Sequence, residues 1–543
     1  MRARIDSIII KYLKAKNLNS DILYSIEYPK QEEFGDYSTN IAMLLSKQLK
    51  KKPYLIAEEF RDMALDENLF ERIEIAGPGF INFYIKNSVF IEEIEKINND
   101  TSGYFRPNVK KQKIQVEFVS ANPTGPLHIG HGRGAAIGDS ISRILKFAGH
   151  DVEKEYYIND AGLQMRMLGI STFIRYKQLM GMSEDIPKNG YRGEYIIDIA
   201  KDIMAEYGSN LLNKNEDESI SICMEKSSEV ILKDILNTLS NFRVSFDNFF
   251  KEKRLFDSNE VENSISFLKD KNLIYEKDGA LWFKTTNFGD DKDRVLKKSN
   301  GDYTYFASDI AYHKNKFITR KFDRVIDIWG ADHHGYVKRM KSAVSALGID
   351  SDNLNVILIQ IVNLLRDGEK LSMSTRKAEF VELDKVLEEA GVDAARFMFL
   401  LRSVDSHLDF DVYLAKKQSS ENPVFYAQYA YARISNIFAQ LDKNYEITNK
   451  NLSLLSDKYE INLIKSVVKF KDYIKKAHDE LEPYHIARGI LEIAEKLHKF
   501  YNHIRVIGQE SNLMDARLAL LDAVAKTLKL GFDLIGIEAK KKM

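Results

Sequence analysis

Apolar residues recur along the chain in two spacings, which predict its first elements. The apolar residues of the first predicted helix are three or four positions apart, so that they share one face: Ile5, Ile8, Ile9 and Leu13. A second helix is predicted over 40–49, and the pattern at 73–85 predicts strand with a turn or bulge at Gly77-Pro78-Gly79. Together they predict a small α+β domain over 1–108, with the polar residues 98–113 as its linker.

The order strand, glycine-rich loop, helix, strand follows between residues 114 and 158. Ile114–Val119 is short and rich in β-formers, and it leads into the loop Ser120–Gly132. A helix is predicted from there to about Ala148, and Val152–Ile158 is the next strand. Because βαβ crossovers are right-handed, this unit predicts the opening of a parallel sheet.

Later segments complete the predicted architecture. The sheet is expected to resume at 325–329 and again at 354–360, with a helix between them that ends near Gly348. Asn422 as cap and Pro423 at the first helical position begin a helical region that runs almost to the end. The pattern therefore predicts a multidomain α/β protein with three parts: the small domain, a Rossmann-like parallel-sheet domain over 109–410 with a mostly helical insertion at about 160–300, and an all-α domain over 411–543.

Composition excludes several classes of protein. The 543 residues include 79 basic and 80 acidic side chains, so bulk positive charge cannot hold this chain on nucleic acid, although a local basic groove can exist. The single cysteine, Cys223, excludes a disulfide framework and a zinc site built on several thiolates. The longest uncharged run, 118–132, is rich in glycine, proline and histidine, which excludes a membrane span. We expect a protein of the reducing cytoplasm, without contact to membranes.

The loop His128-Ile-Gly-His131 is the strongest chemical signal. Phosphate binds at helix N-termini beyond the ends of parallel strands, where backbone N–H groups are unpaired. Gly130 and Gly132 would let a nucleotide approach the backbone, and the two histidines add hydrogen-bond donors. The alternative is a pair of histidines that cap or pack a helix. A zinc site is less favoured, because a third ligand is missing nearby.

This loop resembles the HIGH signature of class I aminoacyl-tRNA synthetases, and residues 120–131 are similar to the form found in bacterial arginyl-tRNA synthetases. Further blocks similar to that family occur in order along the chain: 157–162, 289–296, 303–313, 329–336, 393–397, 422–433 and 515–518. The last block resembles the DALR signature of the family's anticodon-binding domain. The resemblance implies that the chain activates L-arginine with Mg-ATP to arginyl-adenylate and pyrophosphate, and transfers arginine to the 3′ end of tRNA(Arg) (EC 6.1.1.19).

The resemblance also implies roles for single residues. A guanidinium is an always-charged planar fork whose natural partner is a carboxylate, and the family comparison gives that role to Asp309. Residue type alone would favour an ordinary helix pair for Asp309 and Tyr305. The other implied arginine-binding residues are Ser120, Asn122, Tyr305 and His333. Those implied for ATP are Gly130, Gly132, Gly330 and Asp332, with His128 and His131 as catalytic residues.

The second signature of class I enzymes departs from the family pattern. The Lys-Met-Ser-Lys-Ser loop is replaced here by Ser372-Met-Ser-Thr-Arg376, so both lysines are missing. We expect Lys370 and Arg376 to supply the catalytic cations, and Met373 and Ser374 to contact ATP. The alternative is a solvated basic loop after the Asp367-Gly368 turn.

The C-terminal region carries aromatic and basic residues suited to RNA. Residues 421–543 hold 19 Lys and Arg against 16 Asp and Glu. Tyr426, Tyr429 and Arg433 lie close together and suit stacking on unpaired tRNA bases, whereas Phe425 and Tyr429, four residues apart, would also suit a helix core. The chain is expected to act as a monomer.

Two other functions stay open on the sequence. Small-substrate adenylyl or nucleotidyl transferases also use a His-x-Gly-His loop, but they lack a helical tail of a hundred residues. A catalytically inactive paralogue that binds tRNA would fit the altered second signature, but it would not need His128, His131 and Asp309 intact.

Overall fold

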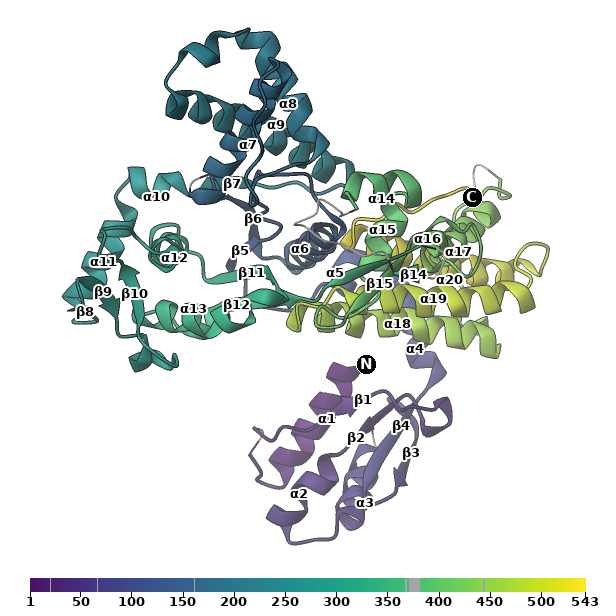
Figure 1. Ribbon diagram of the computed structural model, residues 1–543. Coiled ribbons are helices and arrows are strands. Elements are labelled where there is room, and N and C mark those ends of the chain that lie inside the picture. Colours follow the sequence, from purple (N-terminus) through teal and green to yellow (C-terminus); the bar gives the residue numbers. More distant parts are fainter. Residues whose placement is uncertain (20, 66, 161, 367–368, 371–380, 443–444) are drawn as a thin grey trace.

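A computed structural model describes residues 1–19, 21–65, 67–160, 162–366, 369–370, 381–442 and 445–543. The N-terminal elements form a unit below the C-terminal helices, and helices α7–α9 project on the opposite side (Figure 1). The central parallel sheet lies between them. No helix in these ranges is long and apolar enough to cross a membrane.

The N-terminal unit is an antiparallel sheet of order β1-β2-β4-β3 covered by helices. All four apolar residues of the first predicted helix are buried, which confirms its predicted inner face. The predicted β segment is a hairpin of two strands with Gly77 and Gly79 at positive φ in its turn. The elements are α1 (Arg2–Ala15), β1 (Ile26–Glu27), β2 (Tyr37–Thr39), α2 (Ile41–Leu49), α3 (Pro53–Ala64), β3 (Phe70–Ala76) and β4 (Phe80–Ile85).

Two helices connect this unit to the rest. They are α4 (Asn87–Asn99) and α5 (Thr101–Phe105), and α4 packs on the C-terminal helices. The linker prediction for 98–113 is therefore wrong over its first half. Asp100 caps α5 by accepting a 2.8 Å hydrogen bond from the Gly103 N–H, and Phe105 is buried, so capping and packing make this polar stretch helical.

The central sheet is parallel, with strand order β12-β11-β5-β6-β7. The predicted βαβ unit is confirmed, and so are the strands predicted near 325 and 354. Strand β5 ends two residues earlier than predicted, because Val119 and Ser120 turn into positive φ. The elements are β5 (Lys113–Glu117), α6 (Ile129–Phe147), β6 (Asp151–Ile158), β7 (Asn248–Lys251), β11 (Arg324–Gly330), α13 (His334–Ala346) and β12 (Leu354–Ile359).

Residues 160–300 are not only a helical insertion. Strand β7 returns to the edge of the central sheet, and β8–β10 form a separate antiparallel sheet. The sequence does not predict β7 or the sheet of β8–β10, because each of these strands has only four residues. Four residues are too few to show the alternation of apolar and polar positions that identifies a strand. The elements are α7 (Leu163–Leu179), α8 (Glu194–Tyr207), α9 (Glu216–Asn241), α10 (Lys253–Asp257), α11 (Glu260–Asp270), β8 (Ile274–Lys277), β9 (Ala280–Phe283), β10 (Arg294–Lys297) and α12 (Tyr305–Lys314).

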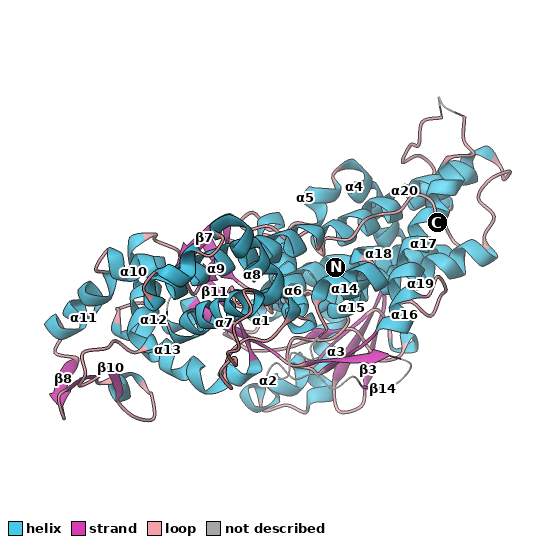
Figure 2. Cartoon of the chain, turned by 45° about the horizontal axis from the view of Figure 1, so that its top comes forward, coloured by secondary structure: helices cyan, strands magenta, loops and turns pink. Residues whose placement is uncertain are grey.

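The region from Asn422 onward is almost entirely helical, as predicted, and Figure 2 shows helices dominating the whole chain. A small sheet of β13 (Val362–Arg366), β14 (Glu369–Lys370) and β15 (Leu408–Asp411) precedes it. Asn422 caps α17 by accepting a hydrogen bond from the Val424 N–H at 3.2 Å, as predicted. The helices are α14 (Leu383–Ala390), α15 (Val392–Phe399), α16 (Val412–Lys416), α17 (Pro423–Phe438), α18 (Lys458–Asp479), α19 (Tyr484–His503) and α20 (Ser511–Leu534).

Candidate functional site

The two histidines of the 128–131 loop lie at the N-terminus of α6 and cap it. His128 Nδ1 accepts from the Gly130 N–H at 3.1 Å, and His131 Nδ1 accepts from the His128 N–H at 3.2 Å. Their rings stack, with centroids 3.7 Å apart. Burial lowers the pKa of His128, and burial together with the His128 charge lowers the pKa of His131 to about 3. Both rings are therefore neutral, and because Nδ1 accepts, the proton is on Nε2. The two histidines can therefore cap the helix through Nδ1 and still donate hydrogen bonds from Nε2, so the capping alternative and the predicted donor role are compatible.

The two glycines of this loop differ. A Cβ atom on Gly130 would lie 3.0 Å from the His128 ring, whereas on Gly132 it would lie 2.6 Å from Leu383 Cδ1 and 3.2 Å from the Phe399 ring. Gly132 is also buried. Packing of α6 against α14 and α15 thus requires this glycine, and its predicted contact with ATP stays a prediction.

Ser120 is held inside the protein by its own hydroxyl. Its Oγ donates to Glu117 Oε1 at 3.1 Å and accepts from the Tyr157 N–H at 3.1 Å. The positive φ of Ser120 turns the loop so that strands β5 and β6 both hold this side chain. Asn122, in the same loop, donates from Nδ2 to Gln164 Oε1 at 2.6 Å.

Asp309 is half-buried on α12, and Tyr336 of α13 donates its hydroxyl to Asp309 Oδ2. Burial raises the pKa of Asp309, although the Tyr336 hydrogen bond and the charges of His313 and Lys316 oppose the shift. Neighbouring cations therefore do not compensate fully for the buried carboxyl group. A cationic ligand would do so.

Two further carboxyl groups that the sequence prediction missed lie around Tyr157. Glu252 is buried, and burial raises its pKa while hydrogen bonds to Ser308 and Tyr157 oppose the shift. Glu117 is also buried, with its pKa raised by burial. The charges of Glu252, Asp309 and Glu117 all reach Tyr157 and, with burial, raise its pKa. Only tertiary structure reveals this acidic cluster, because Glu117 at the end of β5, Glu252 just before α10 and Asp309 on α12 are far apart in sequence.

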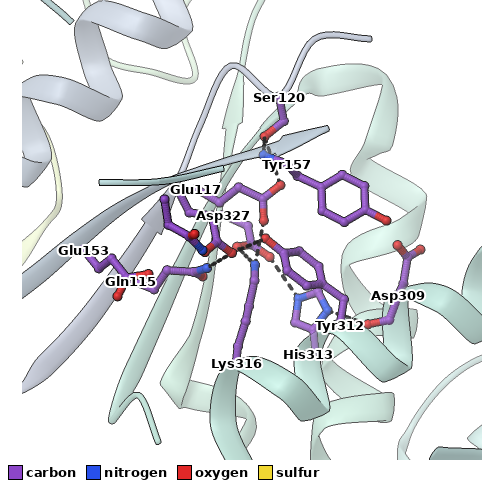
Figure 3. Close-up of polar contacts among 12 residues, drawn as sticks. Gln115, Glu117, Ser120, Glu153, Tyr157, Asp309, Tyr312, His313, Lys316 and Asp327 are labelled. Carbon is purple, nitrogen blue, oxygen red and sulfur yellow. Dashed lines mark hydrogen bonds and ion pairs between the residues drawn. The ribbon is translucent and has the colours of Figure 1, made fainter. Parts of the chain in front are cut away.

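A buried ionic network shares Glu117 with this acidic cluster (Figure 3). Lys316 has no exposed side-chain surface, and its Nζ lies 2.6 Å from Glu117 Oε2 and 2.8 Å from Asp327 Oδ1. His313 joins Asp327 Oδ2 at 2.9 Å to the Asp309 carbonyl oxygen at 2.8 Å. The network thereby connects the residue that holds Ser120 with the helix that carries Asp309.

The remaining residues predicted to bind arginine or the ribose of ATP lie at the surface. Tyr305 is 63% exposed. Gly330 ends β11, and Asp332 and His333 follow it with exposed side chains 3.7 Å apart. They lie at the carboxyl end of the parallel sheet, where ligands bind in such folds.

The second signature falls almost entirely outside the described residues. Met373, Ser374 and Arg376 lie there, whereas Lys370 ends strand β14, which pairs antiparallel with β13. The predicted roles of these four residues stay predictions. In the described ranges, no three His, Cys, Asp or Glu residues are grouped as metal ligands would be.

The predicted RNA-binding residues form a cluster between α17 and α19. The Arg433 guanidinium lies 4.7 Å from the Tyr429 ring centre and 4.5 Å from that of Tyr501, and its NH1 is 3.0 Å from His498 Nδ1. The Tyr426 ring is 4.4 Å from that of His498. Tyr429 is exposed, so a core role for it is wrong. An exposed aromatic ring backed by a cation suits base stacking.

Known proteins match the chain over its whole length. Family profiles match residues 2–85 ("Arginyl tRNA synthetase N terminal domain"), 94–404 ("tRNA synthetases class I (R), catalytic domain") and 427–543 ("DALR anticodon binding domain"). The chain is 47% identical over 525 residues to an arginine--tRNA ligase of Citrifermentans bemidjiense, covering 96% of this chain and 95% of the relative.

Two further similar proteins match this chain over the full length of both chains. An arginine--tRNA ligase of Aquifex aeolicus is 42% identical over 588 residues, with 100% of each chain covered. The solved structure of Thermus thermophilus arginyl-tRNA synthetase has a TM-score of 0.80 at 21% identity and covers 100% of each chain, so it is similar in fold.

Proposed function

The chain belongs to the arginyl-tRNA synthetase family, and on that premise we propose how its residues divide the work of the reaction. The reaction is that of arginine--tRNA ligases (EC 6.1.1.19). ATP and L-arginine give arginyl-adenylate and pyrophosphate, and arginine is then transferred to the 3′ end of tRNA. We divide the chain into residues 1–108, the catalytic part 109–410 and the anticodon-binding part 411–543.

The acidic cluster binds the arginine side chain. The observation that carries this proposal is the pair of buried carboxyl groups, Asp309 and Glu252, whose pKa values burial raises. A guanidinium between them compensates for the burial of both carboxyl groups and offers hydrogen-bond donors to both. Tyr305, exposed on the same helix as Asp309, contacts the bound side chain from the solvent side. Ser120 and Asn122 bind the α-amino and carboxylate groups of arginine, and His333 lines the same binding site.

The ATP site lies beside it, at the N-terminus of α6. His128 and His131 donate from Nε2 to the phosphates, the backbone at Gly130 lets the triphosphate approach, and Gly132 lets α6 pack against α14 and α15 beside this site. Gly330 and Asp332 bind the ribose. Lys370 and Arg376 supply the positive charge that the missing lysines supply in other class I enzymes, with Met373 and Ser374 beside them, and Mg²⁺ arrives with ATP as part of the substrate.

This arrangement performs the first step without a general base. The arginine carboxylate, already ionised at neutral pH, attacks the α-phosphorus, and the bond to the bridging oxygen breaks so that its electron pair leaves on pyrophosphate. Neutral imidazoles are suited to this step because they donate hydrogen bonds to developing negative charge and remove no proton.

The second step brings tRNA(Arg) to the same site. The ribose 2′-OH attacks the adenylate carbonyl and releases AMP, while Tyr426, Tyr429 and Arg433 contact the tRNA. One chain carries all the residues that these steps use, and we propose that it works as a monomer.

Arginine-dependent exchange of labelled pyrophosphate into ATP tests this function, with and without tRNA(Arg). We expect exchange only when arginine and tRNA are both present, because tRNA binding would order the active site. Strong exchange without tRNA would favour the small-substrate transferase instead. Absence of exchange from a folded chain that still binds tRNA would favour the inactive paralogue.

A further inference from the structure

Arg133 lies on α6, two residues after His131, and its side chain is fully buried. Its guanidinium donates to three backbone carbonyl oxygens. NH1 donates to Gln360 at 3.0 Å and to Ser406 at 2.8 Å, and NH2 donates to Ser403 at 2.8 Å. Only the planar fork of arginine can satisfy several fixed acceptors in this way.

These acceptors belong to two segments next to the ATP site. Gln360 connects β12 to β13, the strand that leads to Lys370. Ser403 and Ser406 belong to the turn between α15 and β15, and the Gln360 N–H donates to the Val404 carbonyl of that turn at 3.1 Å. Arg133 therefore connects α6, the helix that carries both histidines, to the segment before β13. Strand β13 leads to Lys370, which flanks the second signature.

The same turn is held from its other side by Glu482. The Val404 N–H donates to both carboxyl oxygens of Glu482, at 3.3 and 3.4 Å. The Ser403 carbonyl and the Val404 N–H are the two ends of one peptide group, which point in opposite directions in a trans peptide. One peptide thus lies between a guanidinium and a carboxyl group, and each hydrogen bond polarises the other.

Glu482 belongs to the turn between α18 and α19, in the anticodon-binding part of the chain. Burial raises its pKa to about 7, with Asp405 and Glu480 adding to the shift and the Val404 N–H and Arg133 opposing it. The carboxyl group therefore lies in low-dielectric surroundings, where a hydrogen bond is strong.

We propose that Arg133 and Glu482 are positioning residues for arginine activation, which hold the end of α6 that carries His128 and His131 in a fixed place relative to the anticodon-binding helices through the Ser403–Val404 peptide. The proposal rests on the assignment of those histidines to the ATP phosphates. A shift of α6 by about 1 Å would misplace both donors, and such a displacement costs about 10²-fold in rate.

Pyrophosphate exchange by Glu482→Ala, at saturating tRNA(Arg), tests the proposal. We expect kcat to fall about tenfold, while KM for arginine and the Kd for tRNA stay within about twofold of the unmodified chain. Glu482→Gln should recover most of kcat, because an amide oxygen also accepts from the Val404 N–H. Glu480→Ala is the matched control, since it removes an exposed carboxylate from the same turn that acts on Glu482 only through its charge and makes no hydrogen bond to this peptide.

Arg133→Lys supplies the second arm. Lysine keeps the charge but loses the fork, so kcat should fall at least tenfold, and adding Glu482→Ala should cost little more, because both changes break one linkage. The proposal is wrong if Glu482→Ala has the same kcat as Glu480→Ala. It is also wrong if both single variants fold and the fall in kcat of the double variant is the product of the two single falls. Should Arg133→Lys fail to fold, the comparison of Glu482→Ala, Glu482→Gln and Glu480→Ala still decides. Exchange by the unmodified chain tests the function itself separately.

Discussion

Burial shifts the pKa values of single side chains in this protein in the directions that suit a charged substrate. Burial raises the pKa of the Asp309 and Glu252 carboxyl groups, so a cation beside them would favour their ionised forms. The imidazoles of His128 and His131 have lowered pKa values and stay neutral. The same desolvation thus acts on acids and bases in opposite directions, and both shifts suit the proposed roles.

Replacing Asp309 by asparagine should abolish most selection for arginine. The amide cannot neutralise a guanidinium, and we expect a loss of about 3–5 kcal/mol, which is hundreds-fold or more in kcat/KM for arginine. KM for ATP and the melting temperature should change little. Steady-state pyrophosphate exchange measures the first two quantities, with Asp302→Asn, on the exposed turn before α12, as the control. Charging within a few-fold of the parent would mean that the guanidinium binds elsewhere.

The buried imidazole of His131 should make stability depend on pH. Its pKa of about 3 in the folded state is below the ordinary 6.5, so the unfolded chain binds more protons between these values. Its contribution to stability is present above pH 6.5 and is lost as the pH falls toward 3. Between pH 7 and 5 the loss should be about 1–2 kcal/mol.

Thermal melting of the parent and of His131→Gln checks this sign. Glutamine at this position can still cap the helix but does not titrate. The melting temperature of the parent should therefore fall relative to that of the variant as the pH is lowered from 7 to 5. A constant or widening advantage of the parent would contradict the predicted direction.

Arg376 is our first choice for the cation of the altered second signature. Its fork can grip two phosphate oxygens, whereas Lys370 offers a point charge. Arg376→Ala should lower kcat of activation by about 10²-fold and leave KM for arginine nearly unchanged. If Arg376→Ala and Lys370→Ala both leave activation almost intact, as exchange kinetics would show, another residue supplies the charge.

At the scale of elements, α6 approaches Phe118, the residue after β5, too closely for any side chain at one position. A Cβ atom on Gly138 would lie 2.2 Å from the Phe118 ring, whereas on Gly134, one turn earlier, the nearest atom would be 3.7 Å away, Ile359 Cδ1. The two glycines thus form a matched pair on one helix.

Gly138→Ala should destabilise the protein, and Gly134→Ala should not. Overpacking at Gly138 forces α6 away from the sheet at a cost of about 1–3 kcal/mol. Alanine at Gly134 keeps ordinary contact and gains about 0.5–1 kcal/mol of helix stability. Denaturant unfolding of both variants measures the difference. Equal effects would show that the helix and sheet are not packed as closely as described.

At the scale of the whole molecule, Arg396 of α15 joins distant parts of the chain. Its buried guanidinium donates to Asp139 of α6 at 2.6 Å, to the Phe242 carbonyl after α9 at 3.0 Å and to the Ile535 carbonyl after α20 at 3.0 Å. The catalytic sheet domain, the end of the insertion and the last helix are thereby fixed together.

Arg396→Ala should weaken this assembly strongly. The change leaves the buried carboxylate of Asp139 with fewer partners, and breaking a buried pair costs about 3–5 kcal/mol. The melting temperature should fall by several degrees, while Arg402→Ala, at an exposed position close by, should change it little. Calorimetry of both variants measures the effect. A melting temperature equal to that of Arg402→Ala would show that these segments are held by other contacts.

Signals that act within about twenty residues were readable from the sequence. The buried face of α1, the βαβ unit around the 128–131 loop and the Asn422-Pro423 start of α17 depend on periodicity and capping, which are local. The family resemblance added the ligase reaction, which the comparisons support over the full chain.

Tertiary structure alone decided what depends on distant partners. Strand β7 exists because a four-residue segment pairs with β6, and α5 is helical because Asp100 caps it and Phe105 is buried. The acidic cluster that includes Glu252 and the burial of Lys316 arise where elements up to two hundred residues apart converge. Burial and hydrogen-bond partners set the charge state of such groups, and no local pattern contains them.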